Sequence, residues 1–183
     1  GECFPVHLPD GQIICNIFGQ NEYGRNKDIV YTNYTALKLA FNRLGKYCIN
    51  TIYSRVYCMY KNKEISATKA LSMIPNYSID ANKETFPEIP NYLYNKISEF
   101  TVNIIETLYH DAKKEAHIIN NIEMVDYLKN NLSIDNTILK ISVAIPYNMG
   151  CGLGNGSWEE VLKIIKDFEA EYQDFVDVQI WRL

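Results

Sequence analysis

The order of segments in the last third of the chain constrains the fold more than any other feature. Residues 138–145 form a nearly continuous apolar run, as expected of a strand covered on both faces. A glycine-rich loop follows, and then a helix whose apolar stripe runs from Val161 to Phe168. Residues 176–181 close the chain as a second strand. Strand, loop, helix and strand make a βαβ unit, so we expect two parallel strands and a right-handed crossover in an α/β fold.

The loop over residues 146–156 has the clearest chemical character. Glycine occupies four alternate positions in it, Gly150, Gly152, Gly154 and Gly156. Backbone without Cβ atoms lets a ligand approach closely, and amides ahead of a helix bind anions, so phosphate is the expected ligand. We expect Ser157 to cap the helix and at least one of Gly152 and Gly154 to adopt a positive φ. A tight structural turn is the alternative interpretation.

The start of the chain predicts a β-hairpin. Two short apolar runs, at residues 3–8 and 12–18, are separated by a turn sequence. In that turn Pro9 presets φ and Gly11 supplies a positive φ. We therefore expect two antiparallel strands here.

A helix is expected after the hairpin. Thr32 or Asn33 is placed to cap it, and Gly45 is expected to end it. Residues 47–60 are rich in β-branched and aromatic side chains, which suit either a strand or a helix. The pattern does not separate these two alternatives.

The middle of the chain predicts mainly helices. A short helix is expected over residues 66–74, and the stretch 76–90 lacks a period and predicts a loop. Residues 92–116 and 118–132 each carry apolar side chains at helical spacing. These segments are interpreted as packing helices.

Composition excludes several classes of protein. The chain has 183 residues, of which 47% are apolar and 22% are charged, as is typical of one globular domain or one domain with an insertion. The net charge is -4 and no Lys/Arg run exceeds a pair, so the chain is not predicted to bind nucleic acid. No apolar run approaches the roughly 18 residues of a membrane span, so no membrane association is predicted.

Cysteine usage indicates a reducing compartment. The cysteines are Cys3, Cys15, Cys48, Cys58 and Cys151, an odd number with no Cys-x-x-Cys spacing. This usage favours small buried thiols over a disulfide framework or a zinc site, so we expect an intracellular protein, cytoplasmic or nuclear. Gly1 stands where an initiator methionine would, so secretion of a processed chain stays open.

Other candidate chemical groups are weaker. His110 and His117 lie seven positions apart near Asp111 and Glu115, which is compatible with a metal site, but a solvated pair is the favoured interpretation. Ser157 has no neighbouring base in the sequence, so a cap is favoured over a nucleophile. We therefore predict neither a metal nor another cofactor.

A specific resemblance is carried by residues 143–159, which read VAIPYNMGCGLGNGSWE. This segment resembles the penultimate strand and second ligand loop of macrodomains, in the phage and fungal branch associated with ADP-ribose 1″-phosphate phosphatase activity. Supporting matches are residues 16–20 (NIFGQ), 31–37 (YTNYTAL) and 178–181 (VQIW). Together the matching blocks cover about residues 1–45 and 136–183. The first strand, first ligand loop and adenine-binding Asp of the family pattern have no match in the chain.

The resemblance implies a fold and a domain organisation. The expected fold is α/β, a macrodomain-like mixed sheet with flanking helices, formed by residues 1–45 and 132–183. Residues 46–131 are then an inserted helical subdomain. Because the first half of the family pattern is missing, the insertion, a protein partner or a second chain is expected to cover the incomplete sheet.

The resemblance also implies a function, recognition of ADP-ribose or ADP-ribose 1″-phosphate. The implied ligand-binding residues are Gly150, Cys151, Gly152, Leu153, Gly154, Asn155, Gly156, Ser157 and Trp158, with Phe18, Gly19 and Gln20 as a second wall. Hydrolysis of the phosphate or of an ADP-ribosyl linkage would make the protein a hydrolase, but no catalytic residue carries over, since Gly154 stands where the glycohydrolase branch has Asp. The alternative is a non-catalytic, degenerate macrodomain scaffold that acts through protein–protein contacts of its helical insertion.

Overall fold

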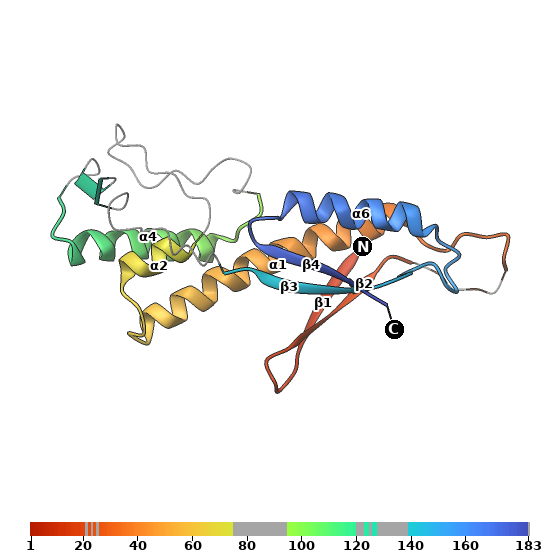
Figure 1. Ribbon diagram of the computed structural model, residues 1–183, viewed down its shortest axis with the longest axis horizontal. Coiled ribbons are helices and arrows are strands. Elements are labelled where there is room, and N and C mark those ends of the chain that lie inside the picture. The colour runs from red at the N-terminus through yellow and green to blue at the C-terminus, as the bar shows by residue number, and fades with distance from the viewer. Residues whose placement is uncertain are drawn as a thin grey trace. The chain divides into compact units, whose positions relative to one another are not determined.

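The computed structural model describes residues 1–20, 22, 24, 26–74, 95–119, 123–124, 126–127 and 139–182 (Figure 1). The chain divides into two compact units. The first, called the α/β unit, consists of Gly1–Tyr47 with Ile141–Leu183, and the second, called the helical unit, consists of Cys48–Lys140. The protein is thus a mixed α/β protein whose described strands all belong to the first unit.

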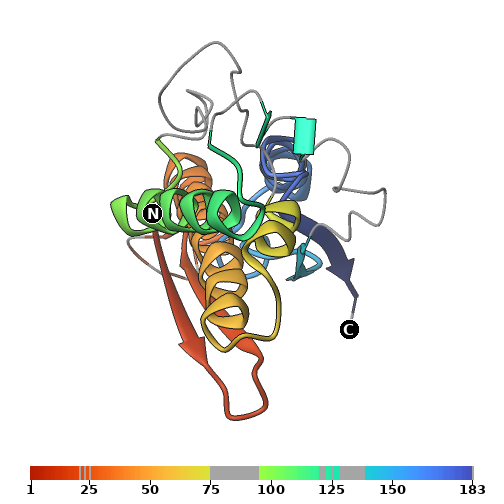
Figure 2. The same cartoon turned by 90° about the vertical axis from the view of Figure 1, so that its left-hand side faces the viewer.

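The chain opens with the predicted hairpin. Strands β1 (Glu2–His7) and β2 (Ile13–Phe18) pair antiparallel, with Cys3 opposite Ile17. The turn is closed by the Leu8 amide, which donates to the Gln12 carbonyl at 2.8 Å, and Gly11 adopts a φ of 85°. Both views of the ribbon show the hairpin as a narrow two-stranded arm (Figures 1 and 2). The prediction of a hairpin turn with a left-handed glycine is confirmed.

The end of the chain forms the predicted pair of parallel strands. Strands β3 (Ile141–Pro146) and β4 (Val176–Trp181) pair parallel, and helix α6 (Trp158–Glu171) lies between them in the sequence. Within the described residues, β1–β2 and β3–β4 are two separate two-stranded sheets, which differs from the single mixed sheet expected.

Strand β3 is covered on one face only, so the prediction of a strand buried on both faces is wrong. Ser142 and Ala144 are exposed, whereas Ile145 is buried. The apolar run that the sequence shows in this strand alternates between the two faces of the strand, and small side chains occupy the exposed face. Small side chains place little apolar surface in water, so this face needs no cover.

Helix α1 (Tyr34–Lys61) is far longer than predicted. Its first turn is capped by Asn33, whose Oδ1 accepts a hydrogen bond from the Ala36 amide at 2.9 Å, which decides between the two predicted caps. The helix continues through Gly45, so the prediction of an end near this glycine is wrong, and the open question over residues 47–60 is decided for helix. A Cβ atom at Gly45 would collide with the Tyr172 ring, so glycine here permits close packing.

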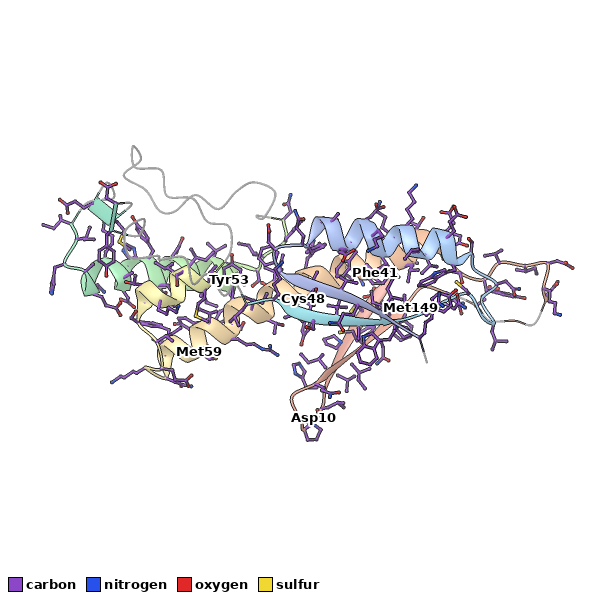
Figure 3. The ribbon with its side chains drawn as sticks, in the orientation of Figure 1. Asp10, Phe41, Cys48, Tyr53, Met59 and Met149 are labelled. Atoms are coloured by element: carbon purple, nitrogen blue, oxygen red, sulfur yellow. The ribbon has the colours of Figure 1, made fainter. Side chains whose placement is uncertain are left out.

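The core of the α/β unit lies where the first part of α1 packs against α6. Phe41, labelled in Figure 3, lies with its ring centroid 5.2 Å from that of Phe168, which in turn lies 5.4 Å from Tyr172. The Tyr172 hydroxyl donates to the carbonyl of Asn42 at 3.2 Å. Aromatic packing and one partly buried hydrogen bond thus join segments about 130 residues apart in the sequence.

The helical unit packs α2 (Ala67–Met73) against α4 (Glu99–Glu115). The Glu115 carboxylate accepts the Ala67 amide through both oxygens at 3.0 Å, so α4 caps the first turn of α2. The Tyr60 hydroxyl donates to Asp111 Oδ2 at 2.7 Å, which raises the pKa of Tyr60 to about 12 and lowers the pKa of Asp111.

The predictions for the middle of the chain have mixed outcomes. The short helix over residues 66–74 is confirmed as α2 with Ser66 as its cap, because Ser66 Oγ accepts from the Lys69 amide at 3.1 Å. Of the helix expected over 92–116, the described part starts at Glu99, since Ser98 is the cap. The predicted loop at 76–90 and most of the segment 118–132 lie outside the described residues. No helix in the described ranges has both the length and the apolar character needed to cross a membrane.

Candidate functional site

A pocket of about 340 Å³ lies in the α/β unit beside the start of the glycine-rich loop. Three chain segments form it: the end of β2 with the two residues that follow, the start of α1 with Thr32, and the end of the turn after β3. Its lining residues are Ile17, Phe18, Gly19, Gln20, Thr32, Leu37, Met149 and Gly150. The volume is at the small end of the roughly 300–1,000 Å³ typical of ligand pockets.

Thr32 holds the loop in place. Its hydroxyl is almost fully buried and donates to the Gly150 carbonyl at 2.6 Å, while Gln20 Nε2 donates to the same hydroxyl at 3.5 Å. The amides of Tyr31 and Thr32 both donate to the Gly154 carbonyl, at 2.9 and 3.1 Å. This role of Thr32 could not be predicted from the sequence, because a Thr next to a helix start has the local pattern of a cap.

Gly154 is packed inside the loop. It is buried, and a Cβ atom there would collide with Gln20 Nε2 and lie 2.5 Å from Thr32 Oγ1 and 2.7 Å from the Gly150 carbonyl oxygen. Gly156 is in a similar position, since a Cβ atom there would lie 2.8 Å from the same carbonyl oxygen. These two glycines permit the loop to close on itself, which is the structural role that the alternative interpretation describes.

The prediction of a positive φ at Gly152 or Gly154 is wrong. The left-handed residues of the loop are Asn148, Gly150 and Asn155, with φ of 60°, 76° and 49°. Asn tolerates this region because its short polar side chain forms local hydrogen bonds. At Asn155 the hydrogen bonds are long-range instead, since its Nδ2 donates to the carbonyls of Asn26 and Ile29 at 2.9 and 2.8 Å.

Only part of the loop offers amides to a ligand. The amides of Cys151, Asn155 and Gly156 donate to carbonyls of the loop itself, at 3.0, 3.1 and 3.2 Å. Gly152 and Leu153 form the exposed tip, where no described carbonyl accepts their amides. A Cβ atom at Gly152 would meet nothing within 4 Å. The exposed donors of the loop therefore include the two amides at its tip.

The end of the loop at α6 does not line the pocket. Ser157 is the N-cap residue as predicted, but its side chain makes no capping hydrogen bond, and its amide donates to the Tyr34 hydroxyl at 2.8 Å. Trp158 packs edge-on against Tyr147 with centroids 4.8 Å apart, and the Arg182 guanidinium lies 4.2 Å above the same tyrosine ring. Ser157 and Trp158 thus contact other side chains of the protein and do not line the pocket.

Of the twelve predicted ligand-binding residues, the structure brings Phe18, Gly19, Gln20 and Gly150 into one pocket. Met149, labelled in Figure 3, and Leu37 add apolar walls that the sequence analysis did not identify. Cys151 Sγ donates to the Met149 carbonyl at 3.5 Å, and burial raises the pKa of this thiol. Cys151 is therefore protonated at neutral pH and is a poor nucleophile.

The groups considered for a metal site have structural roles. Asp111 accepts from Tyr60, and Glu115 caps α2. His117 lies after the end of α4 with a φ of 55°. Across the part of the chain that the structure describes, no three His, Cys, Asp or Glu side chains are grouped closely enough to hold a metal.

Comparison with known proteins identifies no relative, since no family model, no curated protein and no solved structure matches the chain.

Proposed function

We propose that the α/β unit binds an ADP-ribose-type nucleotide, ADP-ribose or ADP-ribose 1″-phosphate, with the pocket beside Gly150 holding its ribose–phosphate end. The observation that carries the proposal is the meeting of two segments in one pocket. Phe18, Gly19 and Gln20 and the start of the glycine-rich loop are more than a hundred residues apart in the sequence, and both belong to the blocks that resemble macrodomains.

The chemistry of the pocket suits such a ligand. The side chain of Gln20 supplies an amide that orients sugar and phosphate oxygens, and Phe18, Leu37 and Met149 supply apolar walls. The amides of Gly152 and Leu153 at the exposed tip are donors for a phosphate that extends out of the pocket. The proposal therefore places one part of the ligand inside the pocket and its diphosphate along the loop tip.

Calorimetric titration with ADP-ribose and ADP-ribose 1″-phosphate tests this proposal. The key variant is Gly152→Val, because the added side chain enters open space and blocks the tip without touching the fold. The matched control is Gln173→Val, an exposed turn residue at the opposite end of α6. We expect binding by the wild type and the control, and a ten- to hundredfold weaker affinity, roughly, for Gly152→Val, as for loss of hydrogen bonds to a charged group. No heat at high micromolar ligand would overturn the proposal.

The same samples test hydrolysis. If the protein is a hydrolase, it releases phosphate from ADP-ribose 1″-phosphate faster than the Gly152→Val variant does. Binding without phosphate release assigns recognition alone.

A second candidate function, a scaffold that contacts another protein, is favoured by a different observation. One face of the hairpin presents the exposed apolar side chains of Phe4, Val6, Ile14 and Phe18, each about half accessible. Apolar patches of this kind mark surfaces that bind other proteins. We propose that the hairpin makes this contact, whereas the sequence predicts it on the helical insertion. Size-exclusion chromatography with light scattering tests it: self-association that Phe4→Ser abolishes supports the scaffold, and a monomer that binds nucleotide supports the leading proposal.

A further inference from the structure

Two cysteines meet on the inner face of the hairpin. In the β1–β2 register Cys3 lies opposite Ile17 and Cys15 lies opposite Pro5. Cys3 and Cys15 are therefore diagonal neighbours whose side chains lie on the same face of the two strands. Both are half-buried thiols, and neither is part of a disulfide. The other three cysteines of the chain are not on the hairpin.

The pairing changes the chemistry of Cys15. A hydrogen bond with the Cys3 thiol lowers the pKa of Cys15 from its ordinary value of 9.0 to about 7, against the opposing effect of burial. At neutral pH Cys15 is then a thiolate, the form that attacks sulfur, in about half of the molecules. The Cys3 thiol lies within hydrogen-bonding range of Cys15, so it is placed to attack a mixed disulfide formed on Cys15.

We propose that Cys15 and Cys3 form a thiol–disulfide exchange site for low-molecular-weight disulfides, separate from the nucleotide pocket. The Cys15 thiolate attacks one sulfur of the small disulfide, forms a mixed disulfide and releases one small thiolate, which takes a proton from water. The Cys3 thiol then loses its proton to solvent and attacks Cys15 Sγ, which releases the second small thiolate. One disulfide is reduced to two thiols and the protein dithiol is oxidised to a Cys3–Cys15 disulfide.

The geometry indicates that this oxidation is reversible. Diagonal Cα atoms across an antiparallel pair are about 7–8 Å apart, beyond the roughly 6.8 Å that a disulfide usually spans, so the bond forms only if the backbone moves. Closing the bond draws the strands together at this point, and disulfides closed under such constraint are readily reduced. The site is thus suited to cycling with a small thiol pool.

The test uses glutathione disulfide as the probe and the whole chain as the protein. Trypsin releases Cys3 and Cys15 on one peptide, residues 1–25, because no Lys or Arg precedes Arg25. In the wild type we expect this peptide to become two hydrogens lighter and to retain no glutathione. In Cys3→Ser the same peptide should retain one glutathione on Cys15, because nothing resolves the mixed disulfide.

Cys58 is the internal reference, since it is exposed on the helical unit and the other cysteine of that unit, Cys48, is buried ten positions earlier in the sequence. It should keep any glutathione that it acquires. The larger thiolate fraction of Cys15 raises its reaction rate, whereas the lower nucleophilicity of a more acidic thiol lowers that rate. The net expectation is that Cys15 reacts roughly fivefold faster than a thiol of ordinary pKa.

Two outcomes would overturn the proposal. One is a wild-type peptide that carries separate glutathiones on Cys3 and Cys15. The other is a peptide that keeps both thiols while Cys58 is modified. Because both are read on the wild type, they do not depend on whether a variant folds, and nucleotide titration of the same sample reports the leading proposal independently.

Discussion

The glycine-rich loop and the β1–β2 hairpin both contribute to the pocket, but their surfaces differ. The loop turns most of its polar backbone inward, onto Thr32 and onto its own carbonyls. The hairpin leaves apolar side chains such as Phe4 and Phe18 exposed. One wall of the pocket is therefore held by internal hydrogen bonds, and the other is an apolar surface that a ligand or a protein can cover. A glycine-rich sequence is thus no direct measure of how much backbone is available to a ligand.

The largest effect is expected inside the loop. Gly154→Val should lower the free energy of unfolding by about 3 kcal/mol, because the side chain must displace Gln20, Thr32 or backbone atoms. Gly152→Val should change it by less than about 0.5 kcal/mol, as for an exposed position. Urea unfolding of the pair measures both values. Equal values for the two variants would mean that the loop is not closed around Thr32.

A smaller effect is expected at Thr32. Thr32→Val keeps the shape of the side chain and leaves the Gly150 carbonyl without its hydroxyl donor, which should cost about 1–2 kcal/mol. Thr32→Ser retains the hydroxyl and is the matched control. The same urea titration applies, and a Ser variant as unstable as the Val variant would show that the methyl group matters more than the hydrogen bond.

The hairpin should be less sensitive than the loop. Val6→Ser and Ile14→Ser replace exposed side chains, so each should change the free energy of unfolding by about 0.5 kcal/mol or less. Binding of a hydrophobic dye should decrease at the same time, since the exposed apolar face is reduced. If either variant is destabilised as strongly as Thr32→Val, the hairpin face is buried in solution and the contrast with the loop fails.

The smallest effect is a pH dependence on the inner face of the hairpin. The folded pKa of Cys15 lies below its ordinary value, so ionised Cys15 stabilises the fold at high pH, and this contribution is lost as the pH falls through about 7. The stability difference between the wild type and Cys15→Ser should therefore grow in favour of the wild type from pH 6 to pH 9. Thermal melts across this range measure it. A difference independent of pH would mean that Cys3 does not hold the Cys15 thiolate.

Much of the backbone was predictable because its signals are local. The hairpin turn depends on Gly11, the start of α2 depends on Ser66, and the parallel strands β3 and β4 follow from the strand–loop–helix–strand order. In each case neighbouring residues supply the hydrogen bonds or the dihedral angles that define the element. The final strand, predicted over residues 176–181, has these bounds in the structure.

The candidate site was predictable only in part. The sequence analysis selected the glycine-rich loop together with Phe18, Gly19 and Gln20, and four of these residues line the pocket. It did not select Leu37 or Thr32, because helix and cap patterns say nothing about which distant backbone a side chain meets. The left-handed φ was also predicted at the wrong glycines, because the hydrogen bonds of the folded loop decide which residues adopt this conformation.

The sequence by itself determined the kind of most elements, the hairpin turn and the position of the α6 cap at Ser157, because these depend on side chains within a few positions of each other. The tertiary structure alone decided that α1 continues through Gly45, where the Tyr172 ring occupies the space that a Cβ would need. It also decided that the loop closes on Thr32. These outcomes depend on contacts between segments far apart in the chain, and no local pattern records which of them will meet.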